Sequence, residues 1–244
     1  VKPTLTTSDL GTNVTFTFTP SAGVSVRDVK VNGKSVGAVG TYTYRSLQIY
    51  SRIDVTFSDS KIPFTDVRTS DWFYEDVAFV YSEGIFSGTS AVTFSPNASM
   101  TRAMLVTVLY RMAGSPKVEG KVSEKFSDCT DGSWYADAVL WASANKVVDG
   151  YEDGTFKPTK SITRQEMAKV LYGYDKIGGK TAEGITEKLT YTDLDAIADW
   201  ALEAVTYCTA EKYLAGSNGA FSPKGTATRA MGAKVLMNMT KDAA

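Results

Sequence analysis

Apolar residues recur at positions i, i+3, i+4 and i+7 in three stretches of the chain, the spacing that places side chains on one face of an α-helix. The stripes consist of Leu105, Val108, Leu109 and Met112; of Met167, Val170, Leu171 and Tyr174; and of Gly232, Val235, Leu236 and Met239. Each stripe follows a Thr-Arg pair. The pattern predicts three equivalent helices, each with one face turned to a core.

A longer repeat runs through the same part of the chain. The arginines of the Thr-Arg pairs are spaced by 62 and then 65 residues, and each copy shows the same landmarks in one order. These are an aspartate (Asp66, Asp128, Asp193), a tryptophan (Trp72, Trp134, Trp200), a glycine (Gly88, Gly150, Gly216), a Phe-x-Pro segment, a threonine (Thr101, Thr163, Thr228) and an arginine (Arg102, Arg164, Arg229). The order predicts repeat 1 at 61–114, repeat 2 at 126–174 and repeat 3 at 191–240.

Each repeat is predicted to fold as helix, loop and helix. The first helix should begin after Asp71, Ser133 or Asp199, all suitable N-cap residues, and carry the tryptophan in its first turn. One helix pair cannot bury its apolar face alone, so the three repeats should close around a shared core. Linkers rich in Lys, Glu and Gly, at 115–125 and 175–190, separate the repeats.

Residues 1–60 predict a different structure. Val14, Phe16 and Phe18 alternate with polar residues, and Asn32 and Gly33 mark a tight turn. This is a small all-β module, so the fold class is α+β with a mainly α three-repeat part. Because the chain begins inside strand-forming sequence without an initiator methionine or signal peptide, we expect it to be part of a longer secreted protein.

Composition limits the partners. With 26 basic and 27 acidic residues the formal net charge is −1, without the basic excess typical of proteins that bind nucleic acid or anionic membranes. No apolar run approaches the ~20 residues of a membrane span, so direct membrane insertion is not expected. Binding to an acidic polymer would have to come from local positive charge.

Histidine is absent, which excludes Ser-His-Asp and Cys-His catalysis and leaves paired carboxylates as the catalytic apparatus available. The segment 149–154 resembles a calcium loop, but Tyr151 and Lys160 stand where ligand oxygens are needed. We expect no metal and no cofactor. Cys129 and Cys208 could form a disulfide or remain two buried thiols.

Residues 64–240 resemble three tandem S-layer homology domains. Repeat 2 carries the resemblance most fully, with Phe126-Ser-Asp, Trp134, Gly150-Tyr-Glu-Asp-Gly-Thr-Phe-Lys-Pro158 and Ile162-Thr-Arg-Gln-Glu166. Repeats 1 and 3 depart from it in the loop and end in Thr-Arg-Ala-Met. The resemblance implies a pseudo-threefold assembly of a secreted protein at the bacterial cell wall. It also implies non-covalent binding to a secondary cell-wall polysaccharide, with a pyruvylated sugar held between repeats. Residues 1–60 resemble, more weakly, Ig-like β repeats of bacterial surface proteins.

The repeated arginines admit two interpretations. Thr163 can cap its helix and Glu166 can complete a capping box, but Arg164 in the first turn opposes the helix macrodipole. A cation there, together with free helix N–H groups, could bind a carboxylate such as that of a pyruvate ketal. The alternative is a salt bridge between each arginine and the aspartate of its own repeat. On the first interpretation, removing Arg164 would leave the fold nearly as stable.

The tryptophans and glycines are equally open. Each tryptophan could anchor the core or stack on a pyranose face. Each glycine could end a helix with a positive φ angle, allow a sugar acid to approach the backbone, or do both. The candidate glycan contacts are therefore all fifteen repeated landmarks: the arginines, threonines, tryptophans, glycines and aspartates given above. Because repeat 2 alone keeps both the full loop and Glu166, the cleft that contains Arg164 should bind most tightly.

Three classes of function remain. The first is a non-catalytic cell-wall anchor that binds an anionic, pyruvylated ManNAc-type glycan between repeats. The second is an assembly module whose partners are other surface-layer subunits. A carbohydrate-active enzyme that uses paired carboxylates is the third.

Overall fold

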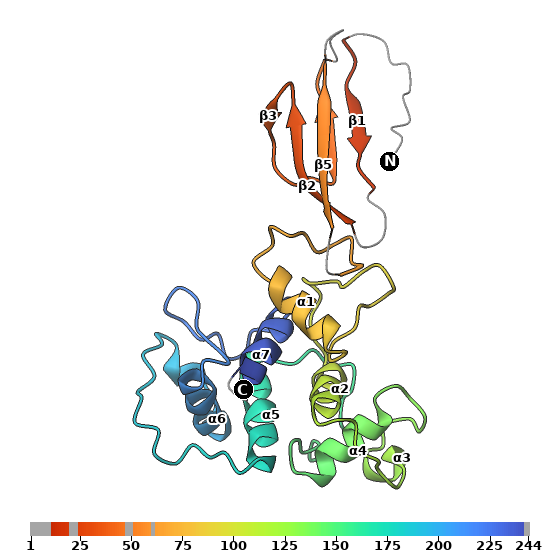
Figure 1. The fold of residues 1–244 in the computed structure, drawn as a ribbon. Helices are drawn as coiled ribbons and strands as arrows, with labels where there is room; N and C mark the ends of the chain where they lie inside the picture. The colour runs from red at the N-terminus through yellow and green to blue at the C-terminus, as the bar shows by residue number, and fades with distance from the viewer. Residues whose placement is uncertain (1–10, 20–23, 47–50, 60–61, 242–244) are drawn as a thin grey trace. The chain divides into compact units, whose positions relative to one another are not determined.

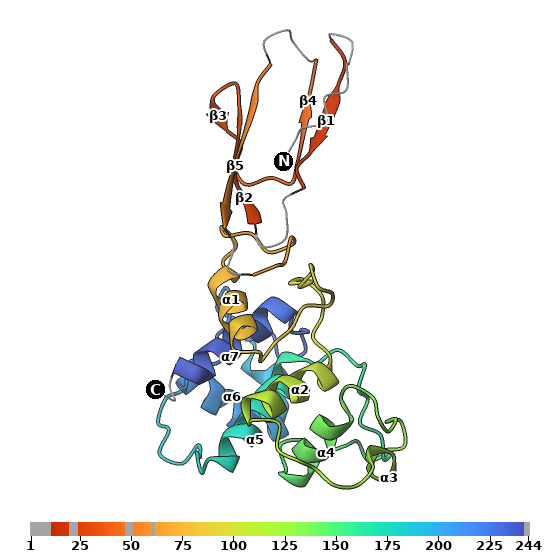
Figure 2. The same ribbon diagram turned by 45° about the vertical axis from the view of Figure 1, so that its right-hand side comes forward.

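A computed structural model describes residues 11–19, 24–46, 51–59 and 62–241 (Figures 1 and 2). The chain divides into two compact units. One unit comprises residues 1–82 and 87–96, and the other comprises residues 83–86 and 97–244. Residues 1–10, 20–23, 47–50 and 60 of the predicted β module lie outside the described ranges.

The described part of the β module forms two small antiparallel sheets. One pairs β1 (Val14–Thr17) with β4 (Thr41–Tyr44), and the other has the order β3 (Lys34–Ser35), β2 (Val24–Val31) and β5 (Ile53–Asp59). Asn32 and Gly33 both have positive φ angles between β2 and β3, which confirms the predicted tight turn. Val26, Val29 and Tyr44 are buried. The first unit also contains helix α1 (Tyr74–Ser82).

The second unit is helical, and the α+β class is confirmed. Its described helices are α2 (Arg102–Met112), α3 (Val122–Lys125), α4 (Ala136–Ala144), α5 (Arg164–Ile177), the short 3₁₀ helix η1 (Leu194–Ala196), α6 (Asp199–Ala210) and α7 (Arg229–Lys241). Helices α2, α5 and α7 are the three predicted striped helices, and each begins at its repeated arginine. Helix α2 packs against α4, and α5 packs against α6. These close pairings therefore join neighbouring repeats.

Three backbone hydrogen bonds close the repeats into a ring. Met100 N–H donates to the Ala227 carbonyl (2.8 Å), Ala227 N–H to the Ile162 carbonyl (3.1 Å) and Ile162 N–H to the Met100 carbonyl (2.9 Å). The three residues are buried, come from repeats 1, 3 and 2, and occupy equivalent positions just before the Thr-Arg pairs. The first and third repeats are therefore in direct contact, as the closed pseudo-threefold arrangement requires.

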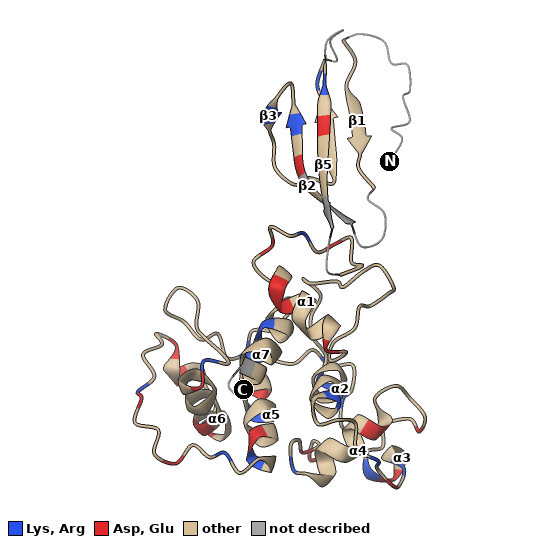
Figure 3. Cartoon of the chain, viewed as in Figure 1, with Lys and Arg blue, Asp and Glu red and all other residues tan. Residues whose placement is uncertain are grey.

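The first helices begin differently from the prediction. Helices α1 and α4 start after their tryptophans, and α6 starts at Asp199 itself, with Ala198 as its N-cap. Ser133 caps nothing, because Tyr135 is the N-cap residue of α4 and the Ser133 hydroxyl has no partner among the described residues. Helix α5 carries both acidic and basic residues, whereas α2 carries only basic ones and α6 only acidic ones (Figure 3). None of the described helices is long and apolar enough to cross a membrane.

Candidate functional site

The repeated arginines lie where the second helix of one repeat meets the loop of the next. We call the contact of Arg102 with residues 149–160 the 1–2 junction, and that of Arg164 with residues 215–225 the 2–3 junction. Arg102 Nε donates to the Phe156 carbonyl (2.8 Å) and Nη2 to that of Asp149 (3.3 Å). The guanidinium carbon lies 4.8 Å from the centre of the Phe156 ring.

Arg164 repeats this geometry in the 2–3 junction. Its Nε donates to the Phe221 carbonyl (2.7 Å), its Nη2 donates to the Ala215 carbonyl (2.6 Å), and its guanidinium lies 4.8 Å from the Phe221 ring centre. Burial lowers the pKa of Arg164. Neither Arg102 nor Arg164 forms the salt bridge with its own repeat's aspartate that was one interpretation of the sequence. Both arginines tie neighbouring repeats together through main-chain carbonyls.

The third arginine is almost completely enclosed. Arg229 is 3% exposed, and its guanidinium lies 4.3 Å from the centre of the Phe86 ring. Its Nη1 contacts the Met104 sulfur at 3.8 Å. Burial of this charge shows that Arg229 is built into the junction of repeats 3 and 1 within the second unit.

The first N–H groups of these helices are occupied, contrary to the expectation that they are free for an anion. In α2, the N–H groups of Arg102 and Ala103 donate to the carbonyls of Lys160 and Pro158, both at 3.0 Å. In α5, the N–H groups of Arg164 and Gln165 donate to Gly225 and Pro223. The loop of the next repeat therefore caps each helix, and a ligand could meet only the arginine side chain.

The threonines act as the predicted N-caps. The hydroxyls of Thr101, Thr163 and Thr228 accept from the N–H groups of Met104, Glu166 and Met231. Only α5 has the complete capping box, because only there does a glutamate stand at the third position. Glu166 Oε2 accepts from the Thr163 N–H at 2.8 Å and from its hydroxyl at 2.9 Å.

The repeated aspartates shape the loops. Each carboxylate accepts two consecutive backbone N–H groups at 2.7–2.8 Å: Asp66 from Phe94 and Ser95, Asp128 from Phe156 and Lys157, and Asp193 from Phe221 and Ser222. The second residue of each pair has a positive φ angle. These bonds, that of Phe221 first, lower the pKa of Asp193. Asp128 and Asp193 fix the turns that present the Phe156 and Phe221 carbonyls to Arg102 and Arg164.

The repeated glycines are required by packing. A Cβ at Gly150 would lie 2.5 Å from the Phe126 ring, one at Gly216 would lie 2.6 Å from the Tyr191 ring, and one at Gly88 would overlap Phe64. Their φ angles are not positive, so the predicted role at a helix end is wrong. Positive φ angles occur instead at Gly84, Lys146 and Lys212.

The tryptophans are exposed. Trp72, Trp134 and Trp200 are 62%, 61% and 51% accessible, so they do not anchor the core. Trp72 and Trp134 stand edge-on to the next aromatic residue, with ring centres 5.2 and 5.3 Å apart. Large exposed indoles are available to a ligand or partner.

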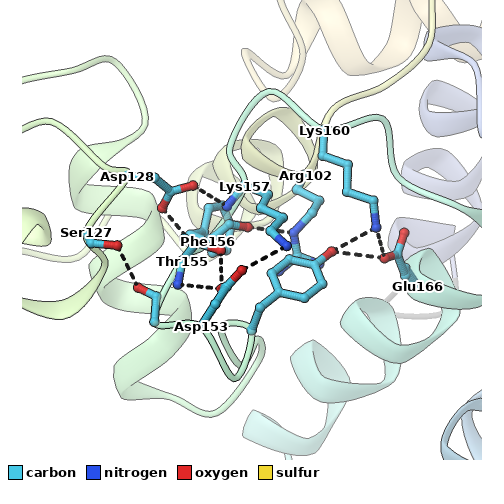
Figure 4. Close-up of polar contacts among 11 residues, drawn as sticks. Arg102, Ser127, Asp128, Asp153, Thr155, Phe156, Lys157, Lys160 and Glu166 are labelled. Carbon is cyan, nitrogen blue, oxygen red and sulfur yellow. Dashed lines mark hydrogen bonds and ion pairs between the residues drawn. The ribbon is translucent and has the colours of Figure 1, made fainter.

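The 1–2 junction holds a cluster of charged side chains that includes Arg102, Lys157 and Lys160 (Figure 4). Arg102, Lys157 and Lys160 place their cationic groups 4.8, 4.1 and 5.1 Å from the Tyr151 ring centre. Lys160 Nζ lies 2.8 Å from Glu166 Oε1 and donates to the Tyr151 hydroxyl at 2.9 Å.

The full loop of repeat 2 therefore contacts Arg102, which overturns the premise that this loop shares a cleft with Arg164. The sequence analysis did not identify either lysine as a site residue. One pattern could have pointed to them, since repeats 1 and 3 have no lysine at the matching positions.

The sequence model of the S-layer homology domain matches residues 63–103, 125–168 and 190–230, just over half of the chain. The chain belongs to the S-layer homology family. It is 29% identical over 216 residues to an amylopullulanase of Thermoanaerobacterium thermosulfurigenes, a match that covers 86% of this chain and 11% of the relative. A cellulosome-anchoring protein of Acetivibrio thermocellus is 30% identical over 116 residues, which cover 46% of this chain and 26% of the relative. The S-layer protein sap of Bacillus anthracis is 24% identical over 178 residues, which cover 73% of this chain and 21% of the relative. The chain spans about a quarter or less of each.

Electrostatics inside SLH repeat 2 stabilise the charged forms of Lys160 and Glu166. Burial alone would raise the pKa of Glu166, but hydrogen bonds from Lys160 and Thr163 outweigh it and lower that pKa. The hydrogen bond to Glu166, followed by that to Tyr151, raises the pKa of Lys160. Both groups are therefore charged near neutral pH.

The cysteines of SLH repeats 2 and 3 are separate. Cys129 and Cys208 are both buried and free, so the disulfide alternative is wrong. Burial raises the pKa of Cys129 to about 11, and burial also raises that of Cys208. Among the described residues, no group of His, Cys, Asp or Glu side chains is arranged to hold a metal ion.

Proposed function

We propose that this chain is a non-catalytic anchor that attaches a secreted protein to the bacterial cell wall. It binds an anionic secondary cell-wall polysaccharide, with a pyruvylated ManNAc-type sugar, between its repeats. The observation that carries the proposal is the state of Arg102 and Arg164. Neutral carbonyls and an aromatic ring hold each guanidinium, and neither forms an ion pair within the described residues. Such a cation has no carboxylate in direct contact, and a sugar carboxylate would supply one.

Two further observations support an anchor. The Nη1 groups of Arg102 and Arg164 make no hydrogen bond within the described residues, so each retains donors for a ligand. The exposed Trp134 and Trp200 offer faces on which a pyranose could stack. One relative is itself named a cellulosome-anchoring protein. The amylopullulanase shares 11% of its length with this chain, which supports a module separate from its catalytic part.

Binding to purified walls, before and after chemical removal of their secondary polymer, tests the proposal. We expect the chain to sediment with intact walls and to remain in solution with stripped walls. Arg102→Ala should weaken sedimentation, while Lys188→Gln, which removes an exposed lysine between repeats 2 and 3 and outside both junctions, should not. Equal binding to both wall preparations would refute the anchor.

The exposed tryptophans also suit a protein partner, so assembly with other surface-layer subunits is the second candidate. Large exposed aromatic side chains are enriched at interfaces between proteins. If assembly is the main function, the chain should self-associate in analytical ultracentrifugation without wall polymer, and Trp134→Ala should reduce that association. A monomer that binds walls would exclude this candidate.

A further inference from the structure

The 1–2 junction carries lysines at two positions where the 2–3 junction has none. Aligned on Pro158 and Pro223, the positions of Lys157 and Lys160 are occupied in repeat 3 by a serine and a glycine, and Lys224 falls on Thr159. On the same alignment Glu166 is replaced by Met231, and Tyr151, which follows Gly150, is replaced by Ser217, which follows Gly216. The two junctions share their backbone frame and their arginine, so the additional groups are not needed to build a junction.

The two lysines point their charges toward the same ring as Arg102. Three cationic groups lie within 5.1 Å of the Tyr151 ring centre. Two carboxylates stand beside them, since Asp153 pairs with Lys157 at 3.1 Å and Glu166 pairs with Lys160 at 2.8 Å. Three cationic groups and two carboxylates therefore surround this ring, while Asp149 and Glu152 of the same loop form no ion pair with the three cations among the described residues. Like charges this close repel each other unless an anion joins them.

Both lysines are available to a ligand. Their side chains are 40% and 43% exposed, and Lys160 Nζ uses two of its three donors, on Glu166 and Tyr151. Exposed ion pairs are weak and exchange readily, so Lys157 can leave Asp153 for a stronger acceptor. Glu166 is only 14% exposed and is held by the Thr163 cap, so it fixes Lys160 in place.

We infer that the 1–2 junction binds a glycan with two acidic groups, one at Arg102 and a second, a carboxylate or phosphate, at Lys157 and Lys160. The 2–3 junction takes a single acidic group at Arg164. This inference rests on the proposed function. It assigns Lys157 and Lys160 as specificity-determining residues of the 1–2 junction and Glu166 as the positioning residue for Lys160.

Calorimetry on the full chain at low salt tests the inference with four probes. The first is a pyruvylated N-acetylmannosamine glycoside, which has one carboxylate. The others are the same sugar linked to a uronic acid, to a sugar phosphate, or to neutral glucose. We expect one of the two doubly acidic probes to bind about tenfold more tightly than the glucose probe, and which one does so identifies the second group. The preference should shrink as salt rises.

Variants separate the possible outcomes. In K157Q/K160Q the tenfold preference should vanish, while the single-carboxylate probe binds within about twofold of the parent value. The control change Lys188→Gln, at an exposed lysine outside both junctions, should leave the preference intact. Equal binding of all linked probes, or a preference that survives in K157Q/K160Q, would overturn the inference while the anchor stands. Parental binding by an Arg102→Ala, Arg164→Ala double variant would instead overturn the proposed function.

Discussion

The 1–2 and 2–3 junctions share one frame but place their polar groups differently. In the 1–2 junction the charges gather at the exposed loop around Tyr151. The 2–3 junction lacks such a cluster, and the polar group between repeats 2 and 3 is buried elsewhere, where Asp175 Oδ2 accepts from the hydroxyls of Tyr207 (2.7 Å) and Tyr213 (2.9 Å) between α5 and α6. Lys180 Nζ completes the group at 3.5 Å. The comparison teaches that duplicated contacts between repeats can diverge, one with its charges at an exposed loop and the other with its charge in the interior.

The largest expected effect comes from breaking the buried Asp175 group between repeats 2 and 3. Asp175 is 7% exposed, and Asp175→Ala would leave two tyrosine hydroxyls without their acceptor. We expect a loss of about 3 kcal/mol of unfolding free energy, measured by urea denaturation. Glu203→Ala, which removes an acceptor from the partly buried Tyr172 hydroxyl, should cost less. Equal losses of unfolding free energy in the two variants would show that the buried Asp175 group stabilises the contact between repeats 2 and 3 no more than the Tyr172–Glu203 hydrogen bond does.

The arginines provide the second test. Arg164→Ala removes two short hydrogen bonds and a ring contact, so we expect it to cost about 2–3 kcal/mol. This replaces the expectation of a nearly unchanged fold. Arg102→Ala should cost less, because its Nη2 bond is longer at 3.3 Å, yet it should weaken glycan binding more. Urea denaturation measures the loss of stability in the two variants, and calorimetry measures their loss of glycan affinity. If the same variant showed the larger loss in both measurements, the predicted difference between the junctions would be wrong.

These arginines also show where sequence reasoning stops. The helix stripes, the Thr caps, the capping box at Glu166 and the closure of the repeats followed from spacing, because local geometry and apolar burial depend on residue type. The acceptors of Arg102 and Arg164 are backbone carbonyls, which every residue carries, so no sequence signal marks them. For the same reason, the matching of Arg102 with the loop of repeat 2 could not be predicted.

The glycines and aspartates teach a related lesson. Gly150 suggested a positive φ angle, but the glycine makes room for the Phe126 ring from 24 positions earlier in the chain. Asp128 was considered as a partner for arginine, but it binds the N–H groups of Phe156 and Lys157. The repeat pattern identified Gly150 and Asp128 as conspicuous positions, but contacts with distant segments of the chain determine what each residue does.

A third prediction concerns the cap of α5. Glu166→Met, which copies repeats 1 and 3, should cost about 1 kcal/mol through loss of the capping box. The pKa of Glu166 is lowered in the fold, so its contribution is fully present above its unfolded pKa. That contribution is lost as pH falls through the lower folded pKa. Urea midpoints should therefore fall less steeply in the variant than in the parent as pH drops below about 4.5. Parallel pH profiles would contradict this.

The smallest stability change is expected for Trp134→Ala. The indole is 61% exposed, so unfolding free energy should change by no more than about 0.5 kcal/mol. Wall binding should nevertheless fall if the indole stacks on a sugar. Retention on walls and thermal melting of the same preparation measure the two effects. A melting point several degrees lower would show that the tryptophan supports the fold.

The ring formed by Met100, Ala227 and Ile162 affects how the protein would bear mechanical force. In an open stack of repeats, tension applied at the two ends passes through every interface in series, and the weakest interface yields first. Here the first and third repeats are bonded directly, so part of the tension bypasses the middle repeat. Rupture then requires two of the three connections to fail together. We therefore expect the closed ring to withstand a higher pulling force than an open stack with the same interfaces.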